Sequence, residues 1–166
     1  MYGLDPKQFK ERIVVPVCRH LDLSTDNAIS LTLGTCMKES LLKYVIQLPN
    51  GPALGVGQME PATHDDIWSN FLAFNATLRL RVMSLLGRAL TDGRPHSKEL
   101  ISNLAYSVAM VRIHYYRAEI KKSRAFPMPP NDPLDLCHYW KRHYNTPLGK
   151  GSVEEALQHF ENAVNL

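Results

Sequence analysis

Helix-start signals are the feature of this sequence that most narrows its fold. A Ser-Thr-Asp-Asn cluster at 24–27, the pair Asp132–Pro133, and Ser152 followed by Glu155 each stand where a helix can begin. Side-chain oxygens of such residues accept hydrogen bonds from the first free N–H groups of a helix, and proline is tolerated in its first turn. Ser152 and Glu155 have the spacing of a capping box. The pattern predicts a mostly α protein.

Proline and glycine punctuate the rest of the chain and set the expected elements. Residues 5–21 are expected to be helical, with Pro16 kinking that helix or ending it early. The stretch between Gln47 and Met59 favours an irregular loop or a small β-hairpin. Further helices are expected from the 24–27 cluster through Ser40, from Thr63–Asp66, over 78–90, from Ser97 to about Lys122, from Pro133 toward His143, and from Ser152 onward. A length of 166 residues suits one domain over 1–166.

Composition limits the classes of function. No apolar run is long enough to span a membrane. The start of the chain lacks the pattern of a Sec-type signal, so we expect synthesis in the cytoplasm. The net charge of +3 is mildly basic. The short basic clusters are expected to lie on solvated helix faces, and attraction to an anionic polymer through a long-range field is the alternative. A nucleic-acid binder is the weakest hypothesis, because the arginine spacing gives no continuous basic face.

Cysteines and histidines give no sign of a metal or redox site. Cys18, Cys36 and Cys137 form no C-x-x-C pair and lie in apolar surroundings, which favours reduced core cysteines, although one disulfide remains open. The seven histidines lack the spacing of known zinc motifs. We therefore expect neither a metal nor another cofactor. We also expect a monomeric protein.

Glu39 is the first candidate for chemistry. It stands at the expected end of a helix, beside an apolar stripe that includes Cys36 and Met37. A carboxyl group in a partly apolar cleft has a raised pKa and can act as a general acid near neutral pH. An ordinary exposed glutamate is the alternative.

The order of four short motifs gives Glu39 more weight. Glu39-Ser40 is followed by "GVGQMEPAT" from Gly55, then by Asn103 at a helix start, and then by "YN" before two glycines, Tyr144 and Asn145. This order resembles the lysozyme-like lytic transglycosylase family, which includes soluble lytic transglycosylases and goose-type lysozymes. The resemblance covers roughly residues 24–160, with residues 1–23 as an added N-terminal helix, and implies a lysozyme-like, mostly α domain.

The resemblance implies an activity and a set of site residues. Cleavage of the β-1,4 bond between N-acetylmuramic acid and N-acetylglucosamine in peptidoglycan is expected, with Glu39 as general acid and base. Ser40, Gly55, Gln58, Tyr144 and Asn145 would bind the glycan strand. Gly55 would let the turn over 55–58 approach the ligand closely.

The chain departs from the family at three places. The family tyrosine that follows the helix-starting asparagine falls on Met110, and Tyr106, one turn earlier, is a candidate replacement. Gly57 stands where the family usually has methionine. A serine often found after the catalytic glutamate has no counterpart between Leu48 and Pro52.

Glu60 leaves the outcome of the reaction open. A goose-type lysozyme has an acid at this place, and a second carboxyl group across the cleft would allow hydrolysis by water. Without it, the C6 hydroxyl of the sugar is the family's nucleophile, giving an anhydro product. Glu60 also suits the start of a helix, which it would favour through the helix dipole. A third hypothesis is a non-catalytic lysozyme-like module of a virion or secretion assembly.

The expected place of action follows from the same reasoning. A wall-degrading protein without a signal would reach the cell wall after host lysis or as part of a phage virion. The large aromatic residues are expected to be core rather than site residues. These are Trp68, Tyr115, Tyr116, Tyr139 and Trp140.

Overall fold

The structure is a computed structural model that describes residues 1–90, 93–120, 126–145 and 149–166. It is mostly helical with almost no strand, as the helix-start signals predict. The α-helices are α1 (Pro6–Phe9), α2 (Val15–Leu21), α3 (Asp26–Ser40), α4 (Pro61–Asn70), α5 (Ala76–Met83), α6 (Glu99–Ser102), α7 (Leu104–Glu119), α8 (Pro133–Trp140) and α9 (Val153–Asn165). Two π-helices, η1 (Lys10–Val14) and η3 (Lys141–Asn145), and a 3₁₀ turn, η2 (Leu72–Phe74), complete them.

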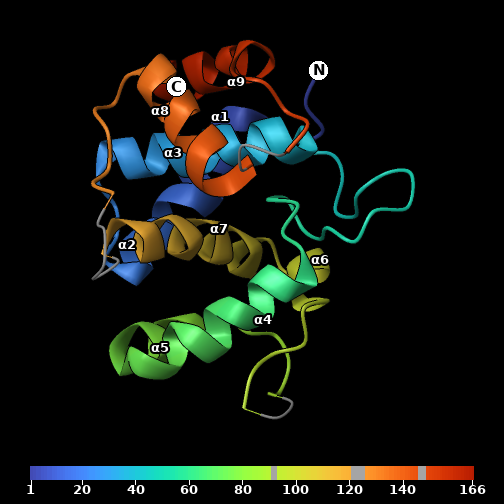
Figure 1. The fold of residues 1–166 in the computed structure, drawn as a ribbon. Coiled ribbons are helices and arrows are strands. Elements are labelled where there is room, and N and C mark those ends of the chain that lie inside the picture. The colour runs from blue at the N-terminus through green and yellow to red at the C-terminus, as the bar shows by residue number, and fades with distance from the viewer. Residues whose placement is uncertain (91–92, 121–125, 146–148) are drawn as a thin grey trace.

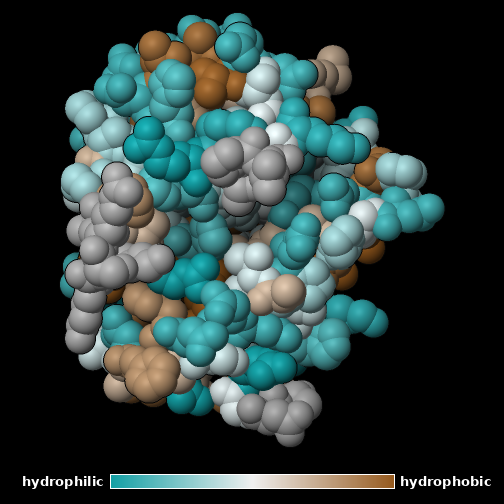
Figure 2. All heavy atoms as spheres, viewed as in Figure 1, coloured by the Kyte–Doolittle hydropathy of each residue, from teal (hydrophilic) through white to brown (hydrophobic). Residues whose placement is uncertain are grey.

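Helix α3 is the centre of the fold. Every residue from Ala28 to Met37 is buried, because neighbours cover the helix on all sides. Helices α8 and α9 lie over one side of α3 and α7 lies on the other, with α4 and α5 beyond α7 (Figure 1). Gly34 permits the close approach of α9, since a Cβ there would lie 2.5 Å from the ring of Phe160. The face of the molecule that Figure 1 presents is mostly hydrophilic at its surface (Figure 2).

The N-terminal helical segment passes through Pro16 instead of ending early. Five residues immediately before α2, Lys10–Val14, form the π-helix η1, and Pro16 then lies in the first turn of α2. Proline has no N–H group and clashes with the carbonyl four residues earlier in a regular α-helix. The wider π turn accommodates this, so helical structure continues to Leu21.

Several expected boundaries are wrong. Helix α4 begins at Pro61, with Glu60 rather than Thr63 at its N-cap. The helix expected from Ser97 is interrupted at Asn103, whose side chain accepts from the backbone N–H of Tyr106 and starts α7. The expected end near Lys122 lies outside the described residues. Helix α5 stops at Met83, short of 90.

The segment between Gln47 and Met59, for which the sequence left a loop and a small hairpin open, is an irregular loop. In the described residues between α3 and α4, the only bridges are isolated ones, Ile46 with Leu54 and Leu54 with Met59. Proline and glycine keep the intervening chain from forming longer ladders. The loop projects from the end of α3 in Figure 1 and returns to the start of α4.

The expected caps at the C-terminal end are confirmed. Asp132 accepts hydrogen bonds from the N–H groups of Leu134 and Asp135. Ser152 and Glu155 form a reciprocal capping box. The three cysteines are free and buried, in agreement with reduced core cysteines. Across the described part of the chain, no helix combines the length and the apolar character needed to cross a membrane.

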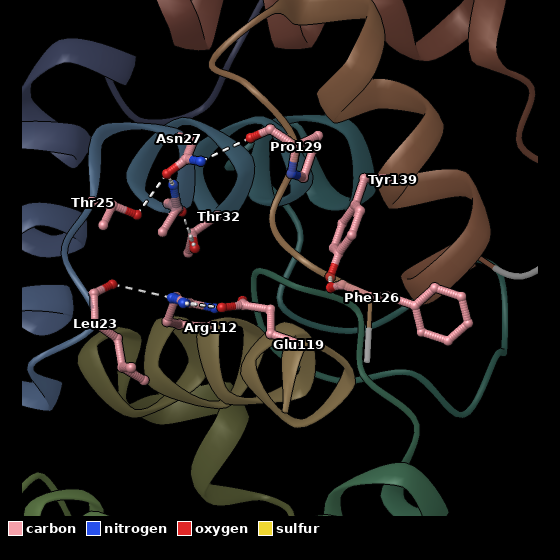
Figure 3. A network of polar contacts seen from close by, with 10 residues as sticks. Leu23, Thr25, Asn27, Thr32, Arg112, Glu119, Phe126, Pro129 and Tyr139 are labelled. Carbon is pink, nitrogen blue, oxygen red and sulfur yellow. Dashed lines mark hydrogen bonds and ion pairs between the residues drawn. The ribbon is translucent and has the colours of Figure 1, made fainter. Parts of the chain in front are cut away.

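Polar contacts fasten residues 126–129, which precede α8 (Figure 3). The Asn27 amide donates to the carbonyl of Pro129, and the Tyr139 hydroxyl donates to the carbonyl of Phe126. Below them, buried Arg112 donates to the carbonyl of Leu23 and to both carboxylate oxygens of Glu119. Residues 126–129 are thereby tied to α3 and α8.

Candidate functional site

A cleft of about 700 Å³ lies where the end of α3, the loop before α4, α7 and η3 meet. Its lining is rich in carboxyl, amide, imidazole and hydroxyl groups and so differs from the core. The lining residues are Glu39, Gln47, Ala53, Gln58, Met59, Glu60, Thr63, His114, His143, Tyr144, Asn145, Gly149, Lys150 and Gly151. The structure therefore brings together five of the eight residues selected from the sequence: Glu39, Gln58, Glu60, Tyr144 and Asn145.

Glu39 is a partly buried carboxyl group in the last turn of α3. Its Oε1 accepts a hydrogen bond of 2.7 Å from the indole N–H of Trp140, on α8. Burial raises the pKa of Glu39 to about 6, although the Trp140 hydrogen bond and the charge of Lys38 act in the opposite direction. The group is thus held in one orientation and titrates close to neutral pH. This matches the requirement for a general acid.

The π-helix η3 delivers three residues to the cleft. Helix α8 ends at Trp140, and the wider turn that follows presents His143, Tyr144 and Asn145. π-turns often occur at functional sites because they re-aim side chains that a regular helix would place elsewhere. The Lys141 ammonium donates to the side chain of Asn145 and to the carbonyl of Gly149, which holds this wall together.

The turn at Gly55 packs against α6 and α7 and does not reach the cleft. Gly55 has a φ of +72°, and a Cβ there would lie 2.3 Å from the hydroxyl of Ser107 and 2.6 Å from the carbonyl of Leu100. The same hydroxyl accepts from the N–H of Val56. Glycine is therefore needed because the turn packs on α6 and α7, and Gly55 is not in the lining of the cleft.

Gly57 explains one departure from the family pattern. The Tyr144 hydroxyl donates to the carbonyl of Gly57 at 2.7 Å. A Cβ on Gly57 would lie 2.2 Å from a methyl group of Val111 and 2.7 Å from the Tyr144 oxygen. The space of a methionine side chain is thus already filled, and Tyr144 fastens η3 to the turn.

Gln58 and Glu60 line the cleft from the start of α4. Gln58 adopts a left-handed backbone with a φ of +47°. Its amide donates to the carbonyl of Gly55 at 2.8 Å, which fixes the side chain at the cleft. Glu60 is exposed and occupies the N-cap of α4 without a side-chain capping bond. Both features inferred for Glu60, a cleft carboxyl and a helix start, therefore coexist.

Ser40 and Tyr106 lie away from the cleft. The buried Ser40 hydroxyl donates to the carbonyl of Cys36 and accepts from the N–H of Leu42, so it closes the end of α3. The fully buried Tyr106 hydroxyl accepts from the indole N–H of Trp68 and pairs with a ring nitrogen of His64. Both hydroxyls are used inside the protein. Met110 is likewise a core residue.

Sequence reasoning missed Trp140, His114 and His143. Trp140 is buried, as expected of a core residue, but its N–H group serves Glu39. Nε2 of His114 lies 2.8 Å from the backbone carbonyl oxygen of His143. Because a carbonyl oxygen only accepts hydrogen bonds, this nitrogen carries the proton. Burial lowers the pKa of His114 to about 4 and also lowers that of His143. No sequence signal marks these residues, because their importance depends on distant neighbours.

The two histidines carry unmet hydrogen-bonding capacity. Among the described residues, Nδ1 of His114 and Nε2 of His143 are buried and have no hydrogen-bond partner. Unsatisfied buried polar atoms are uncommon in folded proteins and call for a specific reason. No group of three or more potential metal-binding side chains occurs in the described ranges.

Comparison with protein-family models, curated proteins and solved structures finds no match for this chain.

Proposed function

We propose that this protein is a peptidoglycan lytic transglycosylase that uses Glu39 as its general acid and base. The observation that carries the proposal is the environment of Glu39. A partly buried carboxyl group with a pKa of about 6 lies on the wall of a polar cleft. The cleft volume of about 700 Å³ falls within the range of small-molecule sites.

The raised pKa makes the acid form available at neutral pH. With a pKa of about 6, roughly one Glu39 in ten is protonated at about pH 7. At the ordinary value of 4.5 the fraction would be roughly one in three hundred. Burial thus increases the reactive form about thirtyfold. This is the property expected of a glycosidase acid.

The reaction follows from one carboxyl group acting twice. The protonated Glu39 gives its proton to the glycosidic oxygen as the bond from C1 of the muramic acid to that oxygen breaks. The resulting carboxylate then takes the proton of the C6 hydroxyl while O6 forms a bond to C1. The Trp140 N–H group stabilises the carboxylate between the two steps. Gln58 and Asn145 supply amides for sugar hydroxyl and N-acetyl groups.

A second candidate, a goose-type hydrolytic lysozyme, is favoured by one observation. Glu60 lines the same cleft as Glu39 and is exposed. A carboxylate across the cleft can act as a general base for water, which would attack C1 from the opposite face. The product would then carry a reducing end instead of an anhydro ring.

The test is digestion of purified sacculi followed by mass spectrometry of the soluble muropeptides. Wild-type protein, Glu39→Gln and Glu60→Gln are compared, with Glu11→Gln, an exposed acid in η1, as the matched control. We expect anhydro-ended products from the wild type and Glu11→Gln. We expect a loss of at least about a hundredfold in Glu39→Gln, the scale of general acid catalysis.

Other outcomes decide against parts of the proposal. Reducing-ended products that disappear in Glu60→Gln would establish the hydrolytic lysozyme. Full activity of Glu39→Gln would remove Glu39 from the mechanism. No release from walls of several chemotypes would refute both enzymes and leave the non-catalytic lysozyme-like module.

A further inference from the structure

A second cavity of about 640 Å³ adjoins the cleft. His114 and His143 line both spaces and form the wall between them. The other lining residues come from α4, from the end of α7 and from the fastened segment before α8. The second cavity therefore lies directly beside the site that contains Glu39.

The lining of the second cavity is more apolar than that of the cleft. Phe71, Ile120 and Phe126 contribute hydrophobic surface to it. Phe71 packs edge-on against Tyr116 at 6.2 Å between ring centroids, and Phe126 packs against His143 at 4.6 Å. These contacts hold the aromatic walls in position. Such walls suit small apolar groups rather than the hydroxyls of a sugar.

One ion pair stands among these apolar walls. Arg117 donates to the carboxylate of Asp66, and Asp66 also accepts from the Asn70 amide at 2.6 Å. These hydrogen bonds lower the pKa of Asp66, so it stays ionised. The two side chains are 28% and 48% exposed, and a guanidinium has further N–H groups to offer. The cavity thus presents one positive and one negative charge to a ligand.

His114 and His143 add no charge to this space at neutral pH. Burial is the largest cause that lowers the pKa of each imidazole. The electrostatic character of the cavity therefore comes from Asp66 and Arg117. A ligand that complements it carries both charges and small apolar side chains.

We propose that this second cavity binds the peptide stem of peptidoglycan while the attached muramic acid lies in the cleft beside Glu39. The inference rests on the proposed function. The stem combines alanine methyl groups with carboxylates and, at its diamino residue, an amine. The methyl groups match the walls, a carboxylate matches Arg117, and the amine matches Asp66.

Chain length is compatible with this arrangement. Three extended residues span about 10 Å, and a cavity of 640 Å³ is roughly 9 Å across if it is equidimensional. The stem starts on the muramic acid itself, so it can enter the adjoining space without a linker. Further sugar units would bring neither charge and would set hydroxyl groups against Phe71 and Ile120.

Binding of the free stem tetrapeptide, L-Ala-D-isoGlu-diamino acid-D-Ala, tests the inference without requiring catalysis. Titration calorimetry compares wild type with Arg117→Gln and Ile120→Asp, and with Arg12→Gln, an exposed position of η1, as the matched control. Ile120 is 44% exposed, so its replacement leaves the core intact. We expect wild type and Arg12→Gln to bind equally, and both cavity variants to bind at least about tenfold more weakly, from loss or repulsion of a charged contact.

The results separate this inference from the proposed enzyme. Absence of peptide binding by wild type, or equal binding by all four proteins, would overturn it. Tight binding of an uncharged chitin oligosaccharide that Ile120→Asp abolishes would also overturn it, in favour of a sugar site. Peptide binding that Arg117→Gln weakens, in a protein that cuts no sacculi, would support the peptide site and refute the enzyme.

Discussion

Replacement of Glu39 by glutamine should stabilise the protein in a pH-dependent way. Burial makes the ionised form of Glu39 less favourable in the folded chain than in the unfolded chain, as its raised pKa shows. An acid with a raised folded-state pKa costs no stability while it is protonated in both states, below about pH 4.5. The cost develops as the pH rises from 4.5 to about 6 and stays constant above that.

The magnitude follows from the size of the pKa change. A rise from 4.5 to about 6 corresponds to about 2 kcal/mol, because one pKa unit is worth about 1.4 kcal/mol. This is the largest gain expected from Glu39→Gln at about pH 8. The glutamine oxygen can still accept from the indole of Trp140, so no buried N–H group is left unpaired. For a chain of this length, the gain raises the melting temperature by about 4–8 °C.

Urea unfolding followed by tryptophan fluorescence gives the free energy of unfolding from about pH 4 to about pH 8. We expect Glu39→Gln and wild type to converge at the acidic end, to separate between about pH 4.5 and about pH 6, and to differ by a constant amount above that. Glu11→Gln is the matched control, and its effect should stay within about 0.5 kcal/mol. A stability difference that is the same at both ends of the range would show that the pKa of Glu39 is not raised.

Three further changes test the surroundings of the cleft. Trp140→Phe removes a donor that favours the carboxylate, so the pKa of Glu39 should rise above about 6, which NMR titration of its carboxyl carbon would show. Gly57→Ala places a methyl group 2.7 Å from the Tyr144 hydroxyl and should lower the free energy of unfolding by about 1–3 kcal/mol in urea. The proposed glycan cleavage should fall as well. Tyr106→Phe leaves buried partners unpaired and should lower the free energy of unfolding by about 1–3 kcal/mol in urea. The Km of the proposed glycan cleavage should stay unchanged, because Tyr106 lies off the cleft.

Local signals located helix boundaries where the capping group and the capped N–H belong to one short segment. Asp132 and Ser152 act within three residues of themselves, so their roles could be predicted from the sequence. Apolar spacing continues across Asn103 and so predicted one helix from Ser97, whereas motif order placed a helix start at Asn103, where α7 begins. The Asn103 amide also binds the carbonyl of Leu85 and the carboxylate of Glu99, and these contacts stabilise the interruption.

In the candidate site, too, some features could be predicted from the sequence and others depend on contacts with distant residues. Motif order selected Gln58, Tyr144 and Asn145 and added weight to Glu39, and the structure gathers all four on one cleft. Motif order also selected Gly55, which meets Ser107 and Leu100 rather than the cleft. A glycine signals a close approach of the backbone, but the sequence does not say what approaches it.

The sequence by itself determined the helical class, the caps of α8 and α9 and the presence of a glutamate at the end of α3. Those properties depend on groups a few residues apart. Only the tertiary structure decided that Glu39 titrates near neutrality and that a second cavity adjoins its cleft. The donor to Glu39 comes from Trp140, 101 residues away, and the shared wall joins His114 to His143. Burial and long-range hydrogen bonds set these properties, and both arise only when distant segments pack together.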